Sequence, residues 1–303
     1  MVEYPLLSEV DGGAFLNPAN VARFARAAES AGIDGLALTD HPAPSKKWLM
    51  NGGHETLDPF VGLGFAAAVT EHIKLMTFLT VVPYRNPFVT TKSMTAVDVL
   101  SGGRTIFAVG TGYLRSEFAA LGVDFDERNE LFDEAIEVMR GLWTTDEFHF
   151  DGRHFKAMGV TLAPTAVQKP HPPLWLGGNA KVVLRRVADW GDGWAPLLGS
   201  EQLSKTARSP FIANDDELGT RILELKDAMT ARGRDADALD VLAKSIDLPA
   251  DASLEHQIDT LGHLGELGVT WSRMSVRHDR FESALEDLET FGSEVIATTR
   301  GRR

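Results

Sequence analysis

The regular alternation of short apolar runs with longer amphipathic segments constrains the fold of this chain more than any other feature. Strand-like runs recur at 4–7, 35–39, 73–82, 105–109, 174–176, 193–196, 239–244 and 269–276. Segments with helical spacing of apolar residues separate them, at 17–32, 60–69, 88–100, 130–142, 182–190, 217–232, 254–267 and 281–298. A closed (β/α)8 barrel needs eight such units, whereas a doubly wound sheet usually has fewer strands. We therefore predict an α/β fold, a TIM barrel with loop insertions.

Local signals define several of these elements. Asn17-Pro18 and Asn86-Pro87 each place a side-chain acceptor before a proline, which is typical of a helix start. The segment 147–156 alternates and turns at Asp151-Gly152, which indicates a hairpin that interrupts the repeat. Because no linker or shift in composition divides the chain, we expect one domain over residues 1–303.

Composition excludes several classes of protein. Hydrophobic residues make up 44% of the chain without forming a membrane-length apolar run. The formal charge of −13 argues against non-specific binding to nucleic acid or to an anionic membrane. The absence of cysteine excludes a disulfide framework, a thiolate nucleophile and a cysteine-ligated metal. The first residues lack the features of a secretory signal, so we expect a cytoplasmic protein.

In such barrels the functional groups lie at the carboxyl ends of the strands. The residues at those positions are Asp40, His41, Leu79, Thr80, Gly110, Thr111, Gly112, Gly177, Gly178, Asn179, Lys244 and Arg277. His41 is the best candidate for proton transfer, because imidazole changes charge near neutral pH and Asp40 is adjacent. The alternative is a loop histidine that only forms hydrogen bonds.

The glycine turns after two of the predicted strands can each be interpreted as a ligand site or as a structural turn. The turn Gly110-Thr111-Gly112 lets the backbone approach a ligand, but it could equally be a tight strand-to-helix connection. It is not a dinucleotide fingerprint, because Arg115 stands where the third glycine would be. Gly177-Gly178-Asn179 opens a helix, where free N–H groups favour an anion. Lys244 and Arg277 could add positive charge there.

A long connection from 43 to 58 follows the second strand, and connections of this kind often carry function. Four aromatic residues could wall a pocket for a flat organic ligand, or could belong to the core: Trp48, Tyr84, Tyr113 and Trp194. His41, His54 and Asp58 fit no standard metal-ligand spacing, so we predict no metal site.

Several motifs together resemble one family. They are SGGR followed by an apolar strand, GTGYLRSEFAALGVDFDERNELFDEA, LTDH at 38–41, PYRNP at 83–87, PLWLGG at 173–178 and WGDGW at 190–194. These motifs are similar to those of the bacterial-luciferase-like flavin and deazaflavin oxidoreductases, over about two thirds of the chain.

The resemblance implies roles for particular residues. The histidine that matches His41 lies beside the coenzyme ring and is implicated in proton handling, and the aspartate that matches Asp40 contacts the ring. Leu79-Thr80 matches the place of a non-proline cis peptide behind the ring. The turns at Gly110 to Gly112 and at Gly177 to Asn179 correspond to the ring pocket and to the surroundings of the coenzyme phosphate.

The resemblance also narrows the chemistry. Tyr113 stands where the sugar-phosphate dehydrogenase branch has a glutamate proton donor, so that activity is not implied. The GTGYLRSEF variant and the TDHP loop favour coenzyme F420 over FMN. We therefore expect an F420-dependent oxidoreductase that acts on a small organic molecule. The resemblance also implies a homodimer, which the family commonly forms. An FMN-dependent monooxygenase, a non-catalytic ligand-binding barrel and a metal-dependent hydrolase are the alternatives, in that order.

Overall fold

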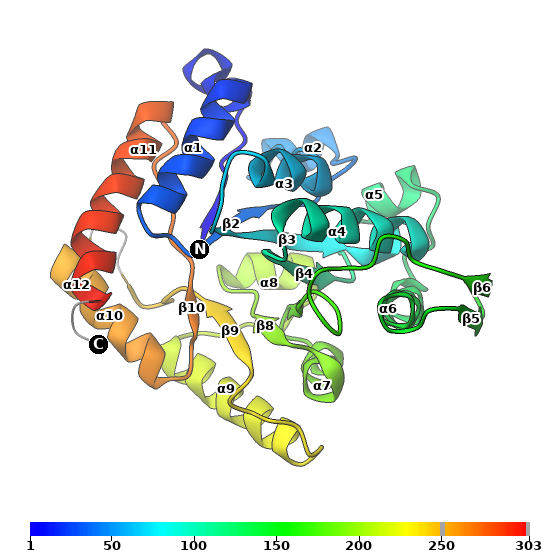
Figure 1. Ribbon diagram of the computed structural model, residues 1–303. Helices are drawn as coiled ribbons and strands as arrows, with labels where there is room; N and C mark the ends of the chain where they lie inside the picture. The colour runs from blue at the N-terminus through cyan, green and yellow to red at the C-terminus, as the bar shows by residue number, and fades with distance from the viewer. Residues whose placement is uncertain (249–251, 301–303) are drawn as a thin grey trace.

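The computed structural model describes residues 1–248 and 252–300. Its main sheet has eight strands in chain order: β1 (Val2–Glu3), β2 (Gly35–Leu38), β3 (Lys74–Val81), β4 (Thr105–Gly110), β7 (Leu174–Gly177), β8 (Gly193–Ala195), β9 (Asp240–Ala243) and β10 (Trp271–Ser272). Every neighbouring pair in this sheet is parallel. Figure 1 shows the helices around the outside of these strands, with the N-terminus close to β10.

The sheet closes on itself. Val2 forms a parallel bridge with Met274, just beyond β10. Two hydrogen bonds strengthen this seam: the Met274 N–H donates to the Met1 carbonyl at 3.0 Å, and the Met1 amine donates to the Ser272 carbonyl at 2.6 Å. The predicted (β/α)8 barrel is thus confirmed.

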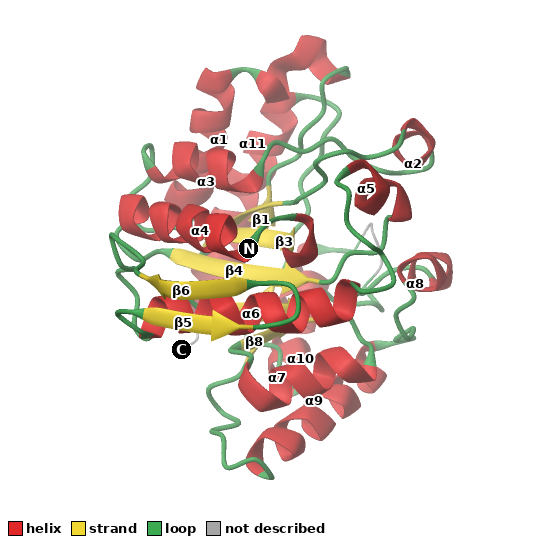
Figure 2. Ribbon diagram, turned by 90° about the vertical axis from the view of Figure 1, so that its right-hand side faces the viewer, coloured by secondary structure: helices red, strands yellow, loops and turns green. Residues whose placement is uncertain are grey.

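The outer layer consists of α1 (Pro18–Ser30), α3 (Pro59–Ala67), α4 (Pro87–Ser101), α6 (Arg128–Thr144), α7 (Lys181–Trp190), α9 (Asp215–Thr230), α10 (Leu254–Glu266) and α11 (Phe281–Thr290), the last continued by a π-helical turn at Phe291–Ile296 and α12 (Ala297–Arg300). Three further helices lie in loops that follow strands: α2 (Lys46–Met50), α5 (Arg115–Ala120) and α8 (Glu201–Ala207). Figure 2 shows these three at the end of the barrel toward which β4 points.

The expected helix starts are present. Asn17 and Asn86 each accept a hydrogen bond from a first-turn N–H, and Asp58 does the same for α3. The hairpin of β5 (Phe148–Asp151) and β6 (Lys156–Val160) is antiparallel and packs against α6 (Figure 2).

Side chains that alternate along the strands form two apolar layers. One lies inside the barrel and contains Met1, Ala37, Met76, Ile106, Ala108, Trp175, Ala195 and Leu242. The other lies between the strands and the outer helices, and includes Phe107, Val109, Leu174, Trp194 and Val241. The barrel is therefore packed inside, and ligand contact is confined to its ends.

Some boundaries differ from the prediction. The first strand is Val2–Glu3 rather than 4–7, because Tyr4 still donates to the Ala37 carbonyl but Pro5 has no N–H to continue the ladder. The last strand covers only Trp271–Ser272 of the expected 269–276. Helix α2 lies within the connection expected at 43–58, and α8 lies between β8 and α9. A serine caps the start of each, Ser45 for α2 and Ser200 for α8.

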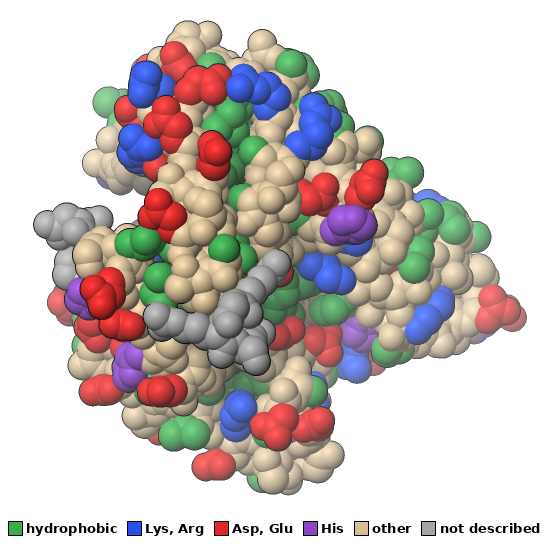
Figure 3. Space-filling view, turned by 60° about the vertical axis from the view of Figure 1, so that its left-hand side comes forward, with side chains coloured by type: hydrophobic (Ala, Val, Ile, Leu, Met, Phe, Trp, Pro, Cys, Tyr) green, Lys and Arg blue, Asp and Glu red, His purple; other side chains and the backbone are tan. Residues whose placement is uncertain are grey.

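The surface is mixed in charge on the face drawn in Figure 3, where Asp and Glu side chains alternate with Lys and Arg. Within residues 1–248 and 252–300, no helix combines the length and the apolar character needed to cross a bilayer.

Candidate active site

The carboxyl ends of β2 and β4 meet at His41. Its Nδ1 lies 3.2 Å from Oε2 of Glu117, a residue of α5 whose side chain is fully buried. Because a carboxylate can only accept, Nδ1 carries the proton in this pair and Nε2 is left as the acceptor. The geometry thus prepares His41 to receive a proton at Nε2.

Two further donors hold Glu117 in place. The Tyr84 hydroxyl donates to Oε2 at 2.8 Å and the Ala43 N–H donates to Oε1 at 3.3 Å. Burial, together with the hydrogen bond to Glu117, raises the pKa of Tyr84 well above its usual value, so the hydroxyl remains a donor. Tyr84 is itself buried, and it supports the His41–Glu117 pair from behind instead of lining an open pocket as expected.

Aromatic rings surround His41. The ring centroids of Trp48, His54 and Tyr113 lie 4.4, 5.3 and 6.4 Å from that of His41. The Trp48 ring also packs on Gly53, where an added Cβ would come within 2.3 Å of it. Burial lowers the pKa of His54 to about 4, with smaller contributions from His41 and Arg273. His54 is therefore neutral at physiological pH, and its Nε2 lies 3.1 Å from the Thr39 hydroxyl.

Asp40 has a different partner from the one expected. Its carboxylate forms two hydrogen bonds with Arg85, at 2.6 and 2.9 Å, and accepts a third from the Val81 N–H. Arg85 also reaches Asp58, the cap of α3. Asp40 is buried, so it fixes the ends of β2 and β3 relative to each other, and the carboxylate beside His41 is that of Glu117.

Glycines and Leu79 form a close-packed floor. A Cβ on Gly177 would lie 2.1 Å from the Leu79 Cδ1 atom, and one on Gly110 would lie 3.1 Å from it. Gly112 has a φ of +75°, and its Cβ would lie 2.6 Å from Val81. At the ends of β3, β4 and β7, an added side chain would therefore have to displace Leu79 or Val81.

The cis peptide bond joins Phe78 to Leu79, one residue before the expected Leu79-Thr80. Thr80 pairs with Val109, a residue of the layer under the helices, so its side chain is directed away from the interior. Thr80 is fully buried, and it can offer a ligand at the mouth only its backbone.

The turn after β7 is tied to the loop after β8. Asn179 donates through Nδ2 to the carbonyls of Leu197 and Pro210, and its N–H donates to the Ser209 hydroxyl. The Gly178 carbonyl accepts from the Trp194 indole at 2.8 Å. Trp194 is completely buried, so it belongs to the core instead of the expected pocket wall.

The basic residue at the end of β10 is not the predicted Arg277. Arg277 lies outside the mouth and bonds to Asp287 at 2.8 Å and Glu286 at 3.2 Å, since β10 ends before it. Arg273 occupies the expected position instead and pairs with Glu3 of β1 at 2.6 Å. Its guanidinium carbon also lies 5.2 Å from the centroid of the Phe78 ring. Lys244 follows β9 and is exposed.

Sequence reasoning missed Glu117, His54 as a neighbour of His41, and the Arg273–Glu3 pair. Glu117 lay within a motif already recognised, where a carboxylate next to Phe118 in an apolar segment was the available signal. Arg273 and Glu3 are 270 residues apart, and only closure of the barrel brings them together.

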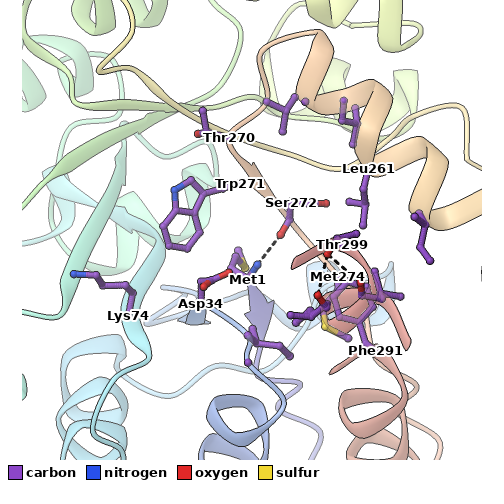
Figure 4. Close-up of a pocket in the computed structure, with 18 of the residues that line it drawn as sticks. Met1, Asp34, Lys74, Leu261, Thr270, Trp271, Ser272, Met274, Phe291 and Thr299 are labelled. Atoms are coloured by element: carbon purple, nitrogen blue, oxygen red, sulfur yellow. Dashed lines mark hydrogen bonds between the residues drawn. The ribbon is translucent and has the colours of Figure 1, made fainter. Parts of the chain in front are cut away.

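A separate cavity of about 960 Å³ lies at the opposite end of the barrel. Figure 4 shows Trp271, Met274 and Phe291 around it, with the Met1–Ser272 hydrogen bond of the closing seam. Its lining combines residues that precede strands, such as 32–34 and 72–74, with residues of α10 and of the C-terminal helical segment. Catalytic groups of this fold gather at the carboxyl ends, so this cavity is not the candidate active site.

The fold and the mouth define an α/β-barrel protein with a histidine–carboxylate pair above a glycine-lined floor. Residues 6–246 match the model of the luciferase-like monooxygenase family, and the chain belongs to this family.

Two curated relatives are similar in sequence. The F420-dependent glucose-6-phosphate dehydrogenase of Gordonia bronchialis is 32% identical over 222 residues, 70% of this chain and 63% of that protein. The FMNH(2)-dependent dimethylsulfone monooxygenase of Pseudomonas putida is 33% identical over 129 residues, 41% of this chain and 35% of that protein. The matched regions thus span less than two thirds of both relatives.

A solved structure supports the fold. The monooxygenase RslO1 from Streptomyces bottropensis superposes with a TM-score of 0.80 at 18% identity, over 98% of each chain.

Proposed function

We propose that this protein is a coenzyme F420-dependent oxidoreductase that acts on a small organic substrate. The observation that carries the proposal is the His41–Glu117 pair, 3.2 Å apart, beside the glycine-lined floor of the barrel mouth. A relative that is 32% identical is named as F420-dependent, and one that is 33% identical is named as FMNH(2)-dependent. FMN is therefore the alternative coenzyme.

The residues present fit a flat coenzyme with a phosphate. Gly110 and Gly177 exclude side chains from the floor on either side of Leu79, which leaves backbone and one aliphatic chain for a ring to rest on. The first turn of α7 begins after Ala180, which provides no side-chain acceptor for its N–H groups, so an anion can take that role. When bound, the coenzyme would supply hydride transfer, which no side chain can perform.

The chain's own residues orient and protect that chemistry. Glu117 holds the Nδ1–H of His41, so Nε2 can take a proton from a substrate hydroxyl or return one. Trp48 from the loop 43–58 and Tyr113 from the segment after β4 pack on the imidazole and shield it from water. Arg273 and Glu3 place a paired charge at the seam between β10 and β1.

The test is equilibrium binding of F420 and of FMN, followed by each coenzyme's absorbance. We expect F420 to bind at least about tenfold more tightly than FMN, a difference of about 1.4 kcal/mol. The Gly177→Asp substitution should abolish binding, because its Cβ would lie 2.1 Å from Leu79 and its carboxylate would enter the floor. The His41→Ala variant should bind but lose turnover.

The outcomes separate the alternatives. Tighter binding of FMN would favour a monooxygenase. Failure of both coenzymes to bind wild-type protein would favour a barrel that binds another ligand. A matched control is Gly64→Asp on α3, where an added Cβ meets nothing within 4 Å, so binding should not change.

The protein is also proposed to form a homodimer in the cytoplasm. Support for the dimer comes from α3 and α4, which pack on each other and expose Val61 (72%), Phe65 (40%) and Val89 (61%). Apolar side chains gathered on adjacent helices are typical of an interface between subunits.

A further inference from the structure

Three arginines converge on one aromatic ring at the mouth end of the barrel. The guanidinium carbons of Arg128, Arg115 and Arg208 lie 4.0, 4.1 and 5.5 Å from the centroid of the Phe125 ring. They come from the start of α6, the start of α5 and the residue after α8. We call Arg115, Arg128 and Arg208 the arginine cluster.

The cluster adjoins the candidate active site on two sides. Phe125 packs edge-on against Phe118 at 5.1 Å, and Phe118 is the ring that a Cβ on Gly112 would meet at 3.0 Å. Arg208 precedes Ser209, whose hydroxyl accepts from the Asn179 N–H in the turn after β7. The cluster therefore lies between the β4 turn and the β7–β8 loops.

Its positive charge is only partly balanced, because Asp126 is the one carboxylate that pairs with the cluster in the part of the chain that the structure describes. Arg115 pairs with Asp126 at 3.1 Å across an exposed surface, and Arg128 donates to the Phe125 carbonyl at 2.9 Å. Within residues 1–248 and 252–300, the Arg208 guanidinium has no hydrogen-bond acceptor or carboxylate partner. This is unusual in a chain with 43 acidic and 30 basic residues. Burial lowers the pKa of Arg128, the charges of Arg208 and Arg115 act in the same direction, and that of Asp126 acts against them.

Arg208 also occupies an unfavourable backbone position. It ends α8 with a φ of +53°, in the left-handed region where glycine is the usual residue. A side chain at such a position adds strain, so the local helix end would be better served by glycine. The retention of an arginine there is explained if its guanidinium has a ligand.

We propose that the arginine cluster binds an extended anion with two or more negative groups, namely the acidic tail of coenzyme F420. This rests on the proposed function. Beyond its ring system, F420 carries a phosphate-linked chain of glutamate carboxylates, whereas FMN ends in one phosphate. Guanidinium groups pair well with carboxylates, and three of them in one place favour a polyanion over a single charge. The cluster would thus select F420 over FMN without touching the reacting atoms.

The experiment compares Arg208→Gln and Arg115→Gln with a matched control, Arg23→Gln. Arg23 on α1 also lies over a ring, 5.3 Å from the Phe281 centroid. Its charge is paired with Glu282 of α11, and it is not part of the arginine cluster. Dissociation constants are measured for F420, for FMN and for the deazaflavin lacking phosphate and tail, at low and high salt. Triglutamate and pyrophosphate serve as probes that contain no ring.

We expect each cluster variant to weaken F420 binding about tenfold at low salt, and less at high salt, because exposed charges are screened. Binding of the tail-less deazaflavin and of FMN should change less than about twofold, and Arg23→Gln should have no effect. Unchanged affinity for F420 and for both probes, or an equal loss for FMN, would overturn the proposal.

The failure of the proposed function gives a different result. Wild-type protein would then bind neither coenzyme, while triglutamate or pyrophosphate would still bind and would do so less tightly in Arg208→Gln. That result would support the anion site and indicate that its ligand is an acidic substrate instead of the coenzyme tail. Absence of probe binding in wild-type protein as well would overturn both.

Discussion

The Nδ1 atom of His41 and the Oε2 atom of Glu117 lie 3.2 Å apart, although the two residues are separated by 76 positions in the chain. His41 follows β2 and Glu117 belongs to the helix after β4. The pair therefore exists only because parallel strands direct their carboxyl ends to one end of the barrel. The first prediction concerns this pair.

Glu117→Gln should reduce turnover by about 100-fold, since general base catalysis contributes about 100- to 10,000-fold and an uncharged amide no longer stabilises the positive charge that the imidazole gains with a proton. Coenzyme affinity should change less than about threefold, because Glu117 is fully buried behind the histidine. The measurements are kcat with the coenzyme that binds, and its dissociation constant. Glu147→Gln is the control, since Glu147 forms a similar pair with His149 on the exposed hairpin. Equal turnover in wild type and Glu117→Gln would remove the pair from the mechanism.

The sequence predicted the parts of this site that depend on local chemistry. Asn17 and Asn86 act as caps within a few residues of their partners, and the glycine turns of β4 and β7 lie at strand ends as expected. A helix start or a tight turn is decided by neighbouring residues, so a single sequence suffices to find it.

The missed parts depend on distant segments. Asp40 adjoins His41 in sequence, yet its carboxylate turns to Arg85, and the partner of His41 comes from another unit of the barrel. The prediction of Arg277 was wrong because the end of β10 is set by its pairing with β9 and by the seam with β1. No local pattern encodes that limit.

The second prediction is a dependence of stability on the protonation of His54. Burial lowers its pKa from 6.5 to about 4. Between these values the unfolded chain binds a proton that the folded chain does not, so the free energy of unfolding falls as the pH drops from about 6.5 to about 4. The loss should be at most about 3 kcal/mol, since each unit of pKa shift corresponds to about 1.4 kcal/mol. Below pH 4 it should not increase further.

Urea unfolding of wild type and His54→Asn across this pH range measures the effect. The variant lacks the titrating group, so its stability should fall less steeply. His149→Asn removes an exposed histidine of the hairpin and should leave the slope unchanged. Parallel pH profiles for wild type and His54→Asn would contradict the assignment.

The third prediction concerns the seam between β10 and β1. Arg273→Met leaves the Glu3 carboxylate without its partner, and should lower the free energy of unfolding by about 2 kcal/mol at neutral pH. Burial already raises the pKa of Glu3, while Arg273 acts in the opposite direction. Without Arg273 the folded state retains its proton to still higher pH, so the destabilisation should grow as pH rises and shrink as pH falls toward 4.5.

A double-mutant cycle with Glu3→Gln isolates the interaction between the two residues. The Glu3→Gln, Arg273→Met double variant should be more stable at neutral pH than Arg273→Met alone, because no unpaired charge remains. If the double variant loses the sum of the two single effects, the residues are not coupled.

The fourth prediction tests the dimer. Phe65 on α3 is 40% exposed, one helical turn from the exposed Val61, and α3 packs on α4, which exposes Val89. Phe65→Asp would place a carboxylate there, and burying it against a second copy would cost several kcal/mol. Light scattering after size exclusion should show a dimer for wild type and a monomer for the variant. Leu223→Asp is the matched control, because Leu223 on α9 is 63% exposed but far along the chain from this surface. A wild-type monomer, or a dimer that persists in Phe65→Asp and dissociates in Leu223→Asp, would place any interface elsewhere.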